Sequence, residues 1–273
     1  MRVLMIGDVV AKPGRVAVLE RIQDLREQHR IDLAVMNAEN VAGGFSITPS
    51  LADQLFASGI DVMTSGNHIF DKRDIIPYIE RHGRLLRPAN YPPGTPGRGA
   101  NLIETHSGRQ VLVLNVMGRI FMDALDDPFA AADREIAQCP LAQVADAIIV
   151  DIHAEATSEK QALAYHLDGR VSVVVGTHTH VPTADHRILP GGTAYMSDAG
   201  MCGDYESVLG LAKDEPVRRF VEKTPGVRAE VATGEGTLSG LAVETDDRTG
   251  LAIRIAAVRI GPKLEESRPA FWE

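Results

Sequence analysis

The sequence predicts an α/β fold that includes a second, partly antiparallel sheet. Short uninterrupted aliphatic runs recur along the chain, as is typical of strands covered on both faces. Between them lie segments in which apolar residues return at three- and four-residue intervals, the period of an amphipathic helix. After about residue 191, strand-like segments follow one another with only turn residues between them. This order predicts alternating strands and helices followed by consecutive strands.

The aliphatic runs in the first two thirds of the chain are the expected buried strands. Their length suits strands better than helices, and turn-forming or polar residues follow them. They are residues 2–7 (RVLMIG), 32–37 (DLAVMN), 61–66 (DVMTSG), 110–115 (QVLVLN), 146–152 (DAIIVDI) and 171–176 (VSVVVG).

Helices are expected over residues 14–29, 48–59 and 158–167, where the apolar spacing is helical. Residues 193–200, 236–247 and 250–261 are the expected late strands, with a hairpin turn at 246–250. The Pro- and Gly-rich residues 87–101 are predicted to be a loop within the domain rather than a linker, because strands continue on both sides.

Length and composition set the general class of protein. With 273 residues and 44% hydrophobic residues, the chain is expected to form one domain over residues 1–273. The formal charge of −9 argues against a long nucleic acid as partner, because a basic face supplies most of that affinity. The apolar run near the N-terminus is too short to span a membrane and lacks a secretory cleavage pattern. We therefore expect a cytoplasmic protein.

The cysteines and the possible oligomeric state do little to narrow the function. Cys139 and Cys202 form no CxxC pair or disulfide framework, so structural thiols in a reducing compartment are the simpler interpretation. Self-association is ordinary for soluble enzymes, and the sequence leaves a homo-oligomer open.

Polar side chains follow five of the predicted strands. Because the carboxyl ends of strands in an open α/β sheet lie at the edge where ligands bind, separate segments can converge there. We expect this edge to gather Asp8, Glu39, Asn40, Asn67, His153, His178 and His180.

These side chains have the chemistry of a metal site. They supply carboxylate, amide and imidazole donors but no thiolate, which suits manganese, iron or zinc. Seven donors are too many for one tetrahedral ion, whereas two ions about 3.5–4 Å apart could share a carboxylate and keep positions for water and substrate. Glu39 is the expected bridge. Each residue alone could be a helix cap, a turn residue or a core histidine; together, with His-x-His and Gly-Asn-His at strand ends, they favour a metal centre.

His68 is the predicted catalytic residue. It is adjacent to Asn67 but lies outside the predicted ligand set, so it could donate a proton to a leaving oxygen. Asp71 could orient it. The simpler alternatives are a structural role for His68 and a helix cap for Asp71.

With these residues in view, the chain resembles the YmdB-like family of the calcineurin-like metallophosphoesterases. Matching segments occur in the family's order over nearly the full length. The segment Asp8-Val9-Val10 departs from the Asp-x-His motif that is common in the superfamily. Val10 stands at the place of the histidine, and Asn40 looks like the replacement ligand. The matching segments are GDVVAKPGR, NAENVAGGFSIT, SGNHIFDKRDI, RPANYPPGTPGRG, DIHAEATSEK, GTHTHVPTAD and SDAGMCGDYESVLG.

The resemblance implies a single metallophosphoesterase domain, a four-layer α-β-β-α sandwich with two mixed β-sheets. It implies that one ion is bound by Asp8, Glu39, Asn40 and His180, and the other by Glu39, Asn67, His153 and His178. Iron is the implied metal, and because imidazole and oxygen donors also accept manganese, the sequence does not separate the two.

The implied activity is phosphodiester hydrolysis by a hydroxide that bridges the ions, with His68 as general acid. The implied substrate is a small cyclic nucleotide, with 2′,3′-cyclic AMP as the first candidate. Two alternatives stay open. A metal-dependent amidohydrolase also uses His-x-His, but early in a barrel, and a nucleotide-sensing regulator could bind the same ligand without turnover.

Overall fold

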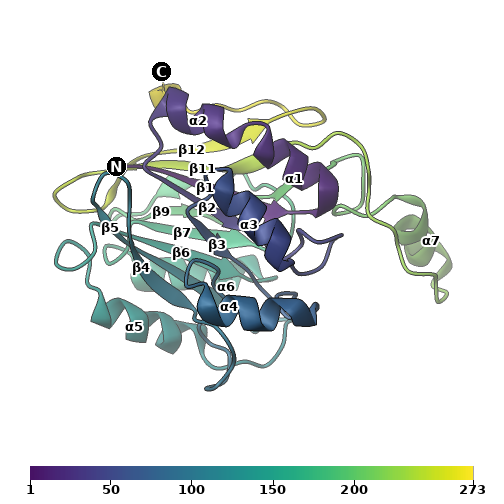
Figure 1. Ribbon diagram of the computed structural model, residues 1–273, viewed down its shortest axis with the longest axis horizontal. Helices are drawn as coiled ribbons and strands as arrows, with labels where there is room; N and C mark the ends of the chain where they lie inside the picture. The colour runs from purple at the N-terminus through teal and green to yellow at the C-terminus, as the bar shows by residue number, and fades with distance from the viewer. Residues whose placement is uncertain (273) are drawn as a thin grey trace.

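Two six-stranded β-sheets, packed face to face, form the middle of the computed structural model, which describes residues 1–272 (Figure 1). Helices cover the outer face of each sheet, so the chain forms the four layers of an α-β-β-α sandwich. The predicted fold class is therefore confirmed.

The first sheet has the strand order β12-β11-β1-β2-β3, and β10 extends it by pairing with β1. β1, β2, β3 and β10 run parallel, whereas β11 and β12 are antiparallel to their neighbours, so this sheet is mixed. The strands span Arg2–Val9 (β1), Leu33–Asn37 (β2), Val62–Thr64 (β3), Met201–Cys202 (β10), Leu238–Thr245 (β11) and Ala252–Ile260 (β12).

The second sheet has the order β4-β5-β6-β7-β9-β8. Its four central strands run parallel, and β4 and β8 pair antiparallel at the two edges. Neither sheet closes into a barrel within residues 1–272, which removes the main structural expectation of the amidohydrolase alternative. The strands span Ala100–Glu104 (β4), Gln110–Met117 (β5), Ala147–His153 (β6), Val173–Thr177 (β7), Arg187–Ile188 (β8) and Ala194–Met196 (β9).

The strands are apolar on both faces because both are covered. Along β1, Val3 and Met5 pack between the sheets, whereas Leu4 and Ile6 pack against the helices. Successive side chains of a strand point to opposite faces, so one uninterrupted run supplies two cores. This explains why the strands lack the alternation of a half-exposed sheet.

Two of the helices, α3 and α5, begin at a side-chain cap. Thr48 accepts a hydrogen bond from the Leu51 N–H at the start of α3, with proline at the first helical position, and Asp127 accepts from Phe129 N–H at the start of α5. α7 extends away from the sandwich at the right of Figure 1. The helices span Ala11–Leu19 (α1), Ile22–His29 (α2), Pro49–Ala57 (α3), Arg73–Ile75 (η1), Ile76–Arg81 (α4), Pro128–Gln138 (α5), Thr157–Leu167 (α6), Asp214–Glu222 (α7) and Ala270–Trp272 (η2).

The structure corrects two details of the predicted fold. The late strands do not build a sheet of their own: β11 and β12 complete the first sheet beside β1, and β9 joins the second sheet beside β7. The predicted helix over 14–29 is two helices that break at residues 20–21. The hairpin at 246–250 is confirmed. Among residues 1–272, no helix is long and apolar enough to cross a membrane.

Candidate metal centre

All seven predicted metal ligands meet at the carboxyl ends of β1, β2, β3, β6 and β7. Asp8 lies on β1, His153 ends β6, and the others follow the strands within a few residues. The ligands come from both sheets, so the site lies across the end of the sandwich rather than along one sheet. Their contacts divide them into two groups, and Glu39, the expected shared residue, contacts the first.

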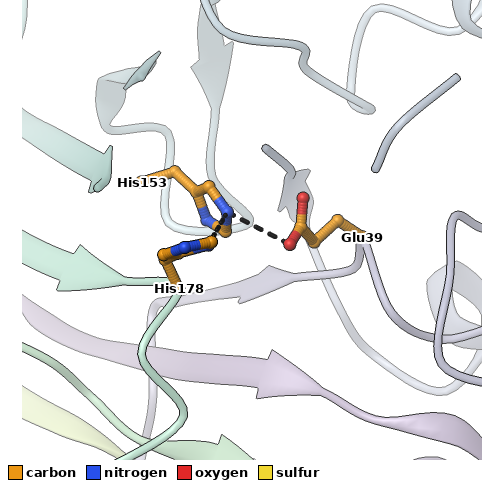
Figure 2. A group of neighbouring side chains, drawn as sticks. All are labelled: Glu39, His153 and His178. Carbon is orange, nitrogen blue, oxygen red and sulfur yellow. Dashed lines mark hydrogen bonds and ion pairs between the residues drawn. The ribbon is translucent and has the colours of Figure 1, made fainter. Parts of the chain in front are cut away.

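The first group surrounds Nε2 of His153. This nitrogen lies 3.1 Å from Glu39 Oε1, 3.0 Å from His178 Nδ1 and 3.0 Å from Asn67 Oδ1. Figure 2 shows the glutamate and the two imidazoles directed at one another. Ligand atoms of Glu39, His153 and His178 all lie within 4.8 Å of one another. Glu39, Asn67, His153 and His178 are the set predicted for one ion. Their carboxylate, amide and imidazole donors fit a manganese, iron or zinc ion.

The second group surrounds Nε2 of His180. This nitrogen lies 3.2 Å from Asn40 Oδ1 and 3.9 Å from Asp8 Oδ1. Asp8 Oδ1 is buried and has no hydrogen-bond partner among the described residues, whereas Asp8 Oδ2 accepts a hydrogen bond from His178 N–H at 3.1 Å. A buried oxygen without a donor is costly, and a bound cation would satisfy it. This group therefore also fits a metal ion.

A buried hydrogen-bond network fixes the orientation of His153. Its Nδ1 lies 2.9 Å from Thr177 Oγ1, and the Thr177 hydroxyl donates to Asp151 Oδ1 at 2.7 Å. Asn37 Nδ2 and the Thr64 hydroxyl both donate to Asp151 Oδ2. Because Nδ1 is engaged on this side, Nε2 is the nitrogen presented to the other donors.

Gly66 leaves the room that His153 occupies. A Cβ at this position would overlap the imidazole of His153. The glycine of Gly-Asn-His therefore has a packing role at the site itself.

The orientation of His180 is fixed by its other ring nitrogen, because Nδ1 lies 3.0 Å from the Leu209 carbonyl oxygen.

Burial and mutual charge shift the pKa values of these groups in opposite directions. Burial raises the pKa of Asp8 to about 6, although His180 and His153 oppose the shift. Burial also acts to raise the pKa of Glu39, but the charge and hydrogen bond of His153 outweigh it and lower that pKa to about 2. For His153, burial acts to lower the pKa, yet Glu39 raises it to about 9. Burial and the neighbouring His153 lower the pKa of His178 to about 3.

Glu39 and His153 therefore favour each other's charged form, whereas the surroundings of His178 favour its neutral form. A cation bound by these residues would replace the proton on His153, since metal ligands bind deprotonated.

His68 lies beside the two groups and is held from three sides. Its backbone N–H donates to Glu39 Oε2 at 2.9 Å, and its Nδ1 lies 2.7 Å from Asp71 Oδ2. The ring of Phe45 meets its imidazole edge-on, with centroids 5.0 Å apart. The His68 side chain is 30% exposed. Asp71 thus orients His68, as the sequence suggested.

A hollow of about 230 Å³ opens over these residues. It is large enough for part of a small ligand. A hollow of about 480 Å³ over α1 and residues 231–236 is lined by none of the seven donors, and one of about 430 Å³ is lined only by His180 among them. The smaller hollow is lined by four of the seven and is therefore the candidate site. The smaller hollow is lined by Glu39, Asn40, His68, Glu155, His178, Thr179, His180 and Leu209.

Two acidic residues at the site were not predicted from the sequence. Glu155 Oε2 lies 3.3 Å from His178 Nε2 at the rim, and Asp151 is buried in the network behind His153. Both residues could have been suspected from their spacing in residues 151–155 (DIHAE). Asp151 precedes His153 by two residues and so lies on the same side of the strand, and Glu155 follows His153 by two residues.

Comparison with known proteins agrees with this arrangement. A family model described as YmdB-like protein matches residues 4–258. The chain is 46% identical over 260 residues to the 2′,3′-cyclic-nucleotide 2′-phosphodiesterase of Bacillus subtilis (strain 168), covering 95% of this chain and 97% of that one.

Two solved structures have the same fold. The crystal structure of a hypothetical protein from Thermus thermophilus has a TM-score of 0.88 and 41% identity, covering 98% of this chain and all of that one. The structure of a Mycoplasma pneumoniae protein described as a novel phosphatase has a TM-score of 0.88 and 30% identity, covering 99% and 95%. The match over nearly all of the sequence, with these relatives, shows that the chain belongs to the YmdB-like protein family.

Proposed function

We propose that the protein is a dinuclear metal-dependent phosphodiesterase that hydrolyses small cyclic nucleotides, with 2′,3′-cyclic AMP as the first candidate. The name of the Bacillus subtilis relative supports the substrate class. The observation that carries the proposal is the arrangement of the site. Glu39 belongs to one group of oxygen and nitrogen donors, donors of a second group line the same hollow, and so does a histidine outside both groups.

The proposed ligands divide as the family resemblance implied. Asp8, Glu39, Asn40 and His180 would hold one ion, and Glu39, Asn67, His153 and His178 the other. Iron is the expected metal, and manganese suits the same donors. When bound, two such cations supply a nucleophile at neutral pH and neutralise phosphate oxygens.

Glu39 contacts both the first group and the proposed acid, one through each of its oxygens. Oε1 lies 3.1 Å from His153 Nε2, in the first group, and Oε2 accepts the His68 N–H. The glutamate therefore links the proposed ligands to the proposed acid, and its position fixes the distance between them.

His68 would donate a proton from Nε2 to the departing alkoxide. The Asp71 carboxylate engages Nδ1, which fixes the ring and leaves Nε2 as the nitrogen that can give its proton to the substrate. Phe45 limits the ring's rotation from the other side. This arrangement of a proton donor held by a carboxylate favours turnover over the sensing alternative.

The test uses protein purified from its native host and analysed for metal, followed by turnover of 2′,3′-cyclic AMP, 3′,5′-cyclic AMP, a model aryl diester and a monoester. We expect two equivalents of metal and fastest turnover of the 2′,3′-cyclic substrate. Glu39→Gln should lose metal and turnover, whereas His106→Ala, an exposed histidine away from the site, should retain both. Binding of the cyclic nucleotide without its consumption would instead support the sensor.

A further inference from the structure

A buried ion pair lies behind the His178–His180 segment and outside the proposed ligand set. Lys160, on α6, is 0% exposed, and its Nζ lies 2.8 Å from Asp198 Oδ2. A lysine is almost never fully buried unless its charge is paired. Its stem passes Gly176, because a Cβ at that glycine would lie 2.7 Å from Lys160 Cδ. The chain thus leaves room for this lysine at the end of β7, directly before the histidine segment.

Asp198 connects this pair to the residue between the two histidines. Its Oδ2 accepts hydrogen bonds from the Thr179 N–H at 3.1 Å and from the Thr179 hydroxyl at 2.8 Å. Its Oδ1 accepts from Gly200 N–H at 2.8 Å, and the Gly200 carbonyl accepts from Asp8 N–H at 3.1 Å. One carboxylate therefore holds the His-x-His backbone and the segment that meets Asp8.

The backbone of the histidine segment needs this support. His178 has φ +98° and His180 has φ +65°, a region that residues other than glycine rarely adopt. Such conformations persist only where the surrounding structure fixes them. The bonds from Thr179 to Asp198 act on the one residue that lies between the two strained positions.

We propose that Lys160 and Asp198 are positioning residues, whose buried ion pair fixes residues 178–180 so that both imidazoles face the proposed ions. Lys160 neutralises a carboxylate that has no access to water, and that carboxylate holds Thr179 by both of its donors. The inference rests on the proposed metal centre, and it adds two residues that act through the backbone rather than as ligands.

The test compares Lys160→Met, Asp198→Asn and Thr179→Val with the wild-type chain. The measurements are the dissociation constant for Mn²⁺ of the metal-free protein, by titration calorimetry, and the melting temperature of the metal-free protein. We expect the first two changes to weaken Mn²⁺ binding by about 10- to 100-fold, as is typical when a group that orients a ligand is lost. Thr179→Val, which removes only the hydroxyl bond, should weaken it less.

Controls separate positioning from general stability. Arg254→Met breaks an ion pair with Glu244 beside the start of β1, at the opposite end of that strand from Asp8, and it should leave the Mn²⁺ dissociation constant unchanged. A lower melting temperature with an unchanged dissociation constant in all three variants would show a merely structural role and overturn the inference. If the two ion-pair variants fail to fold, Thr179→Val decides: an unchanged constant rejects the inference.

His178→Ala distinguishes this inference from the metal centre beneath it. If His178→Ala binds Mn²⁺ as tightly as the wild type, the proposed metal centre itself is wrong. If His178→Ala loses Mn²⁺ while the variants at 160, 179 and 198 keep wild-type affinity, only the positioning inference fails.

Discussion

His68 is the residue whose contacts say most about the proposed reaction. Its backbone N–H donates a hydrogen bond to Glu39, and its ring is hydrogen-bonded to Asp71. His68 therefore contacts a proposed metal ligand without being one itself. We expect His68→Ala to lower kcat by about 10²–10⁴-fold, the usual contribution of a general acid, because the leaving alkoxide then departs without a proton. Steady-state kinetics on 2′,3′-cyclic AMP and metal analysis of the same sample give the measurement.

The metal content decides how that loss is interpreted. It should stay at the wild-type level in His68→Ala, and an aryl diester with an acidic leaving group should be hydrolysed with a smaller loss, since its departure needs less protonation. Unchanged kcat on the cyclic nucleotide would remove His68 from the mechanism.

Gly66 gives a second residue-scale prediction, based on space rather than charge. We expect Gly66→Ala to lower metal content and turnover together by about tenfold or more, because the added Cβ would displace the imidazole of His153. Metal analysis and kinetics measure the effect. Gly94→Ala is a control for glycine replacement in general, since nothing lies within 4 Å of its Cβ position, although its positive φ also disfavours alanine. Full metal occupancy in Gly66→Ala would contradict the prediction.

At this scale the sequence predicted the donors better than their surroundings. His153, for example, can be recognised as a candidate ligand from the sequence alone, because it directly follows an apolar run. The residues that hold these donors in place cannot be recognised in the sequence. Asp198, for example, reaches Thr179, between His178 and His180, only after β7 and β9 have paired. Sequence separation hides such contacts even where the residue types are suggestive.

At the scale of elements, the longest aliphatic runs were predicted best. β1, β5 and β6 match the expected positions, because a buried parallel strand needs several consecutive apolar residues. β4 was missed and lies partly within the predicted loop at 87–101; it is an edge strand whose residues are largely half-exposed or exposed, so its apolar signal is weak. α4, α5 and α7 were missed as well. In α7 only Pro216 is buried.

The loop between β7 and β8 supplies a prediction about acid stability. Burial alone would raise the pKa of Asp185, but hydrogen bonds from the Ser197 and Thr183 hydroxyls outweigh it and lower that pKa below its ordinary value. A carboxyl with a lowered folded-state pKa stabilises the fold above its unfolded pKa of about 3.9, and the contribution is lost as pH falls through the folded-state value.

We therefore expect Asp185→Asn to melt at a lower temperature than the wild type at pH 6, with the difference shrinking as the pH falls below about 4. Thermal melting from pH 6 to pH 2.5 measures it. Asp74→Asn, at an exposed position, should track the wild type throughout. A melting difference at Asp185 that is the same at every pH would show that its charge is not involved.

For the whole molecule, the sequence predicted two mixed sheets but not which strands share a sheet. β11 crosses back from the end of the chain to lie beside β1, pairing Arg2 with Glu244 and Ile6 with Gly240. Both β9 (AYM) and β11 (LSGLAVET) are largely buried, and nothing in either stretch says which of the two sheets it joins. That choice is made by packing across the whole sandwich, in which the inter-sheet core takes residues from both sheets.

The proposed centre spans the same two sheets, which leads to a prediction about metal removal. Glu39 and Asn67 follow strands of the first sheet, whereas His153 and His178 belong to or follow strands of the second, so bound ions would cross-link the layers. Ligand that binds only the folded state stabilises it by about 2.7 kcal/mol at 100 times Kd. Chelation should therefore lower Tm by several degrees, and added Mn²⁺ should restore it in a concentration-dependent way. Scanning calorimetry measures this, with Glu39→Ala, which removes the proposed ligand common to both ions, as the control that should not respond to Mn²⁺. An equal response of Glu39→Ala, or no response of the wild type, would show that no ion joins the two sheets here.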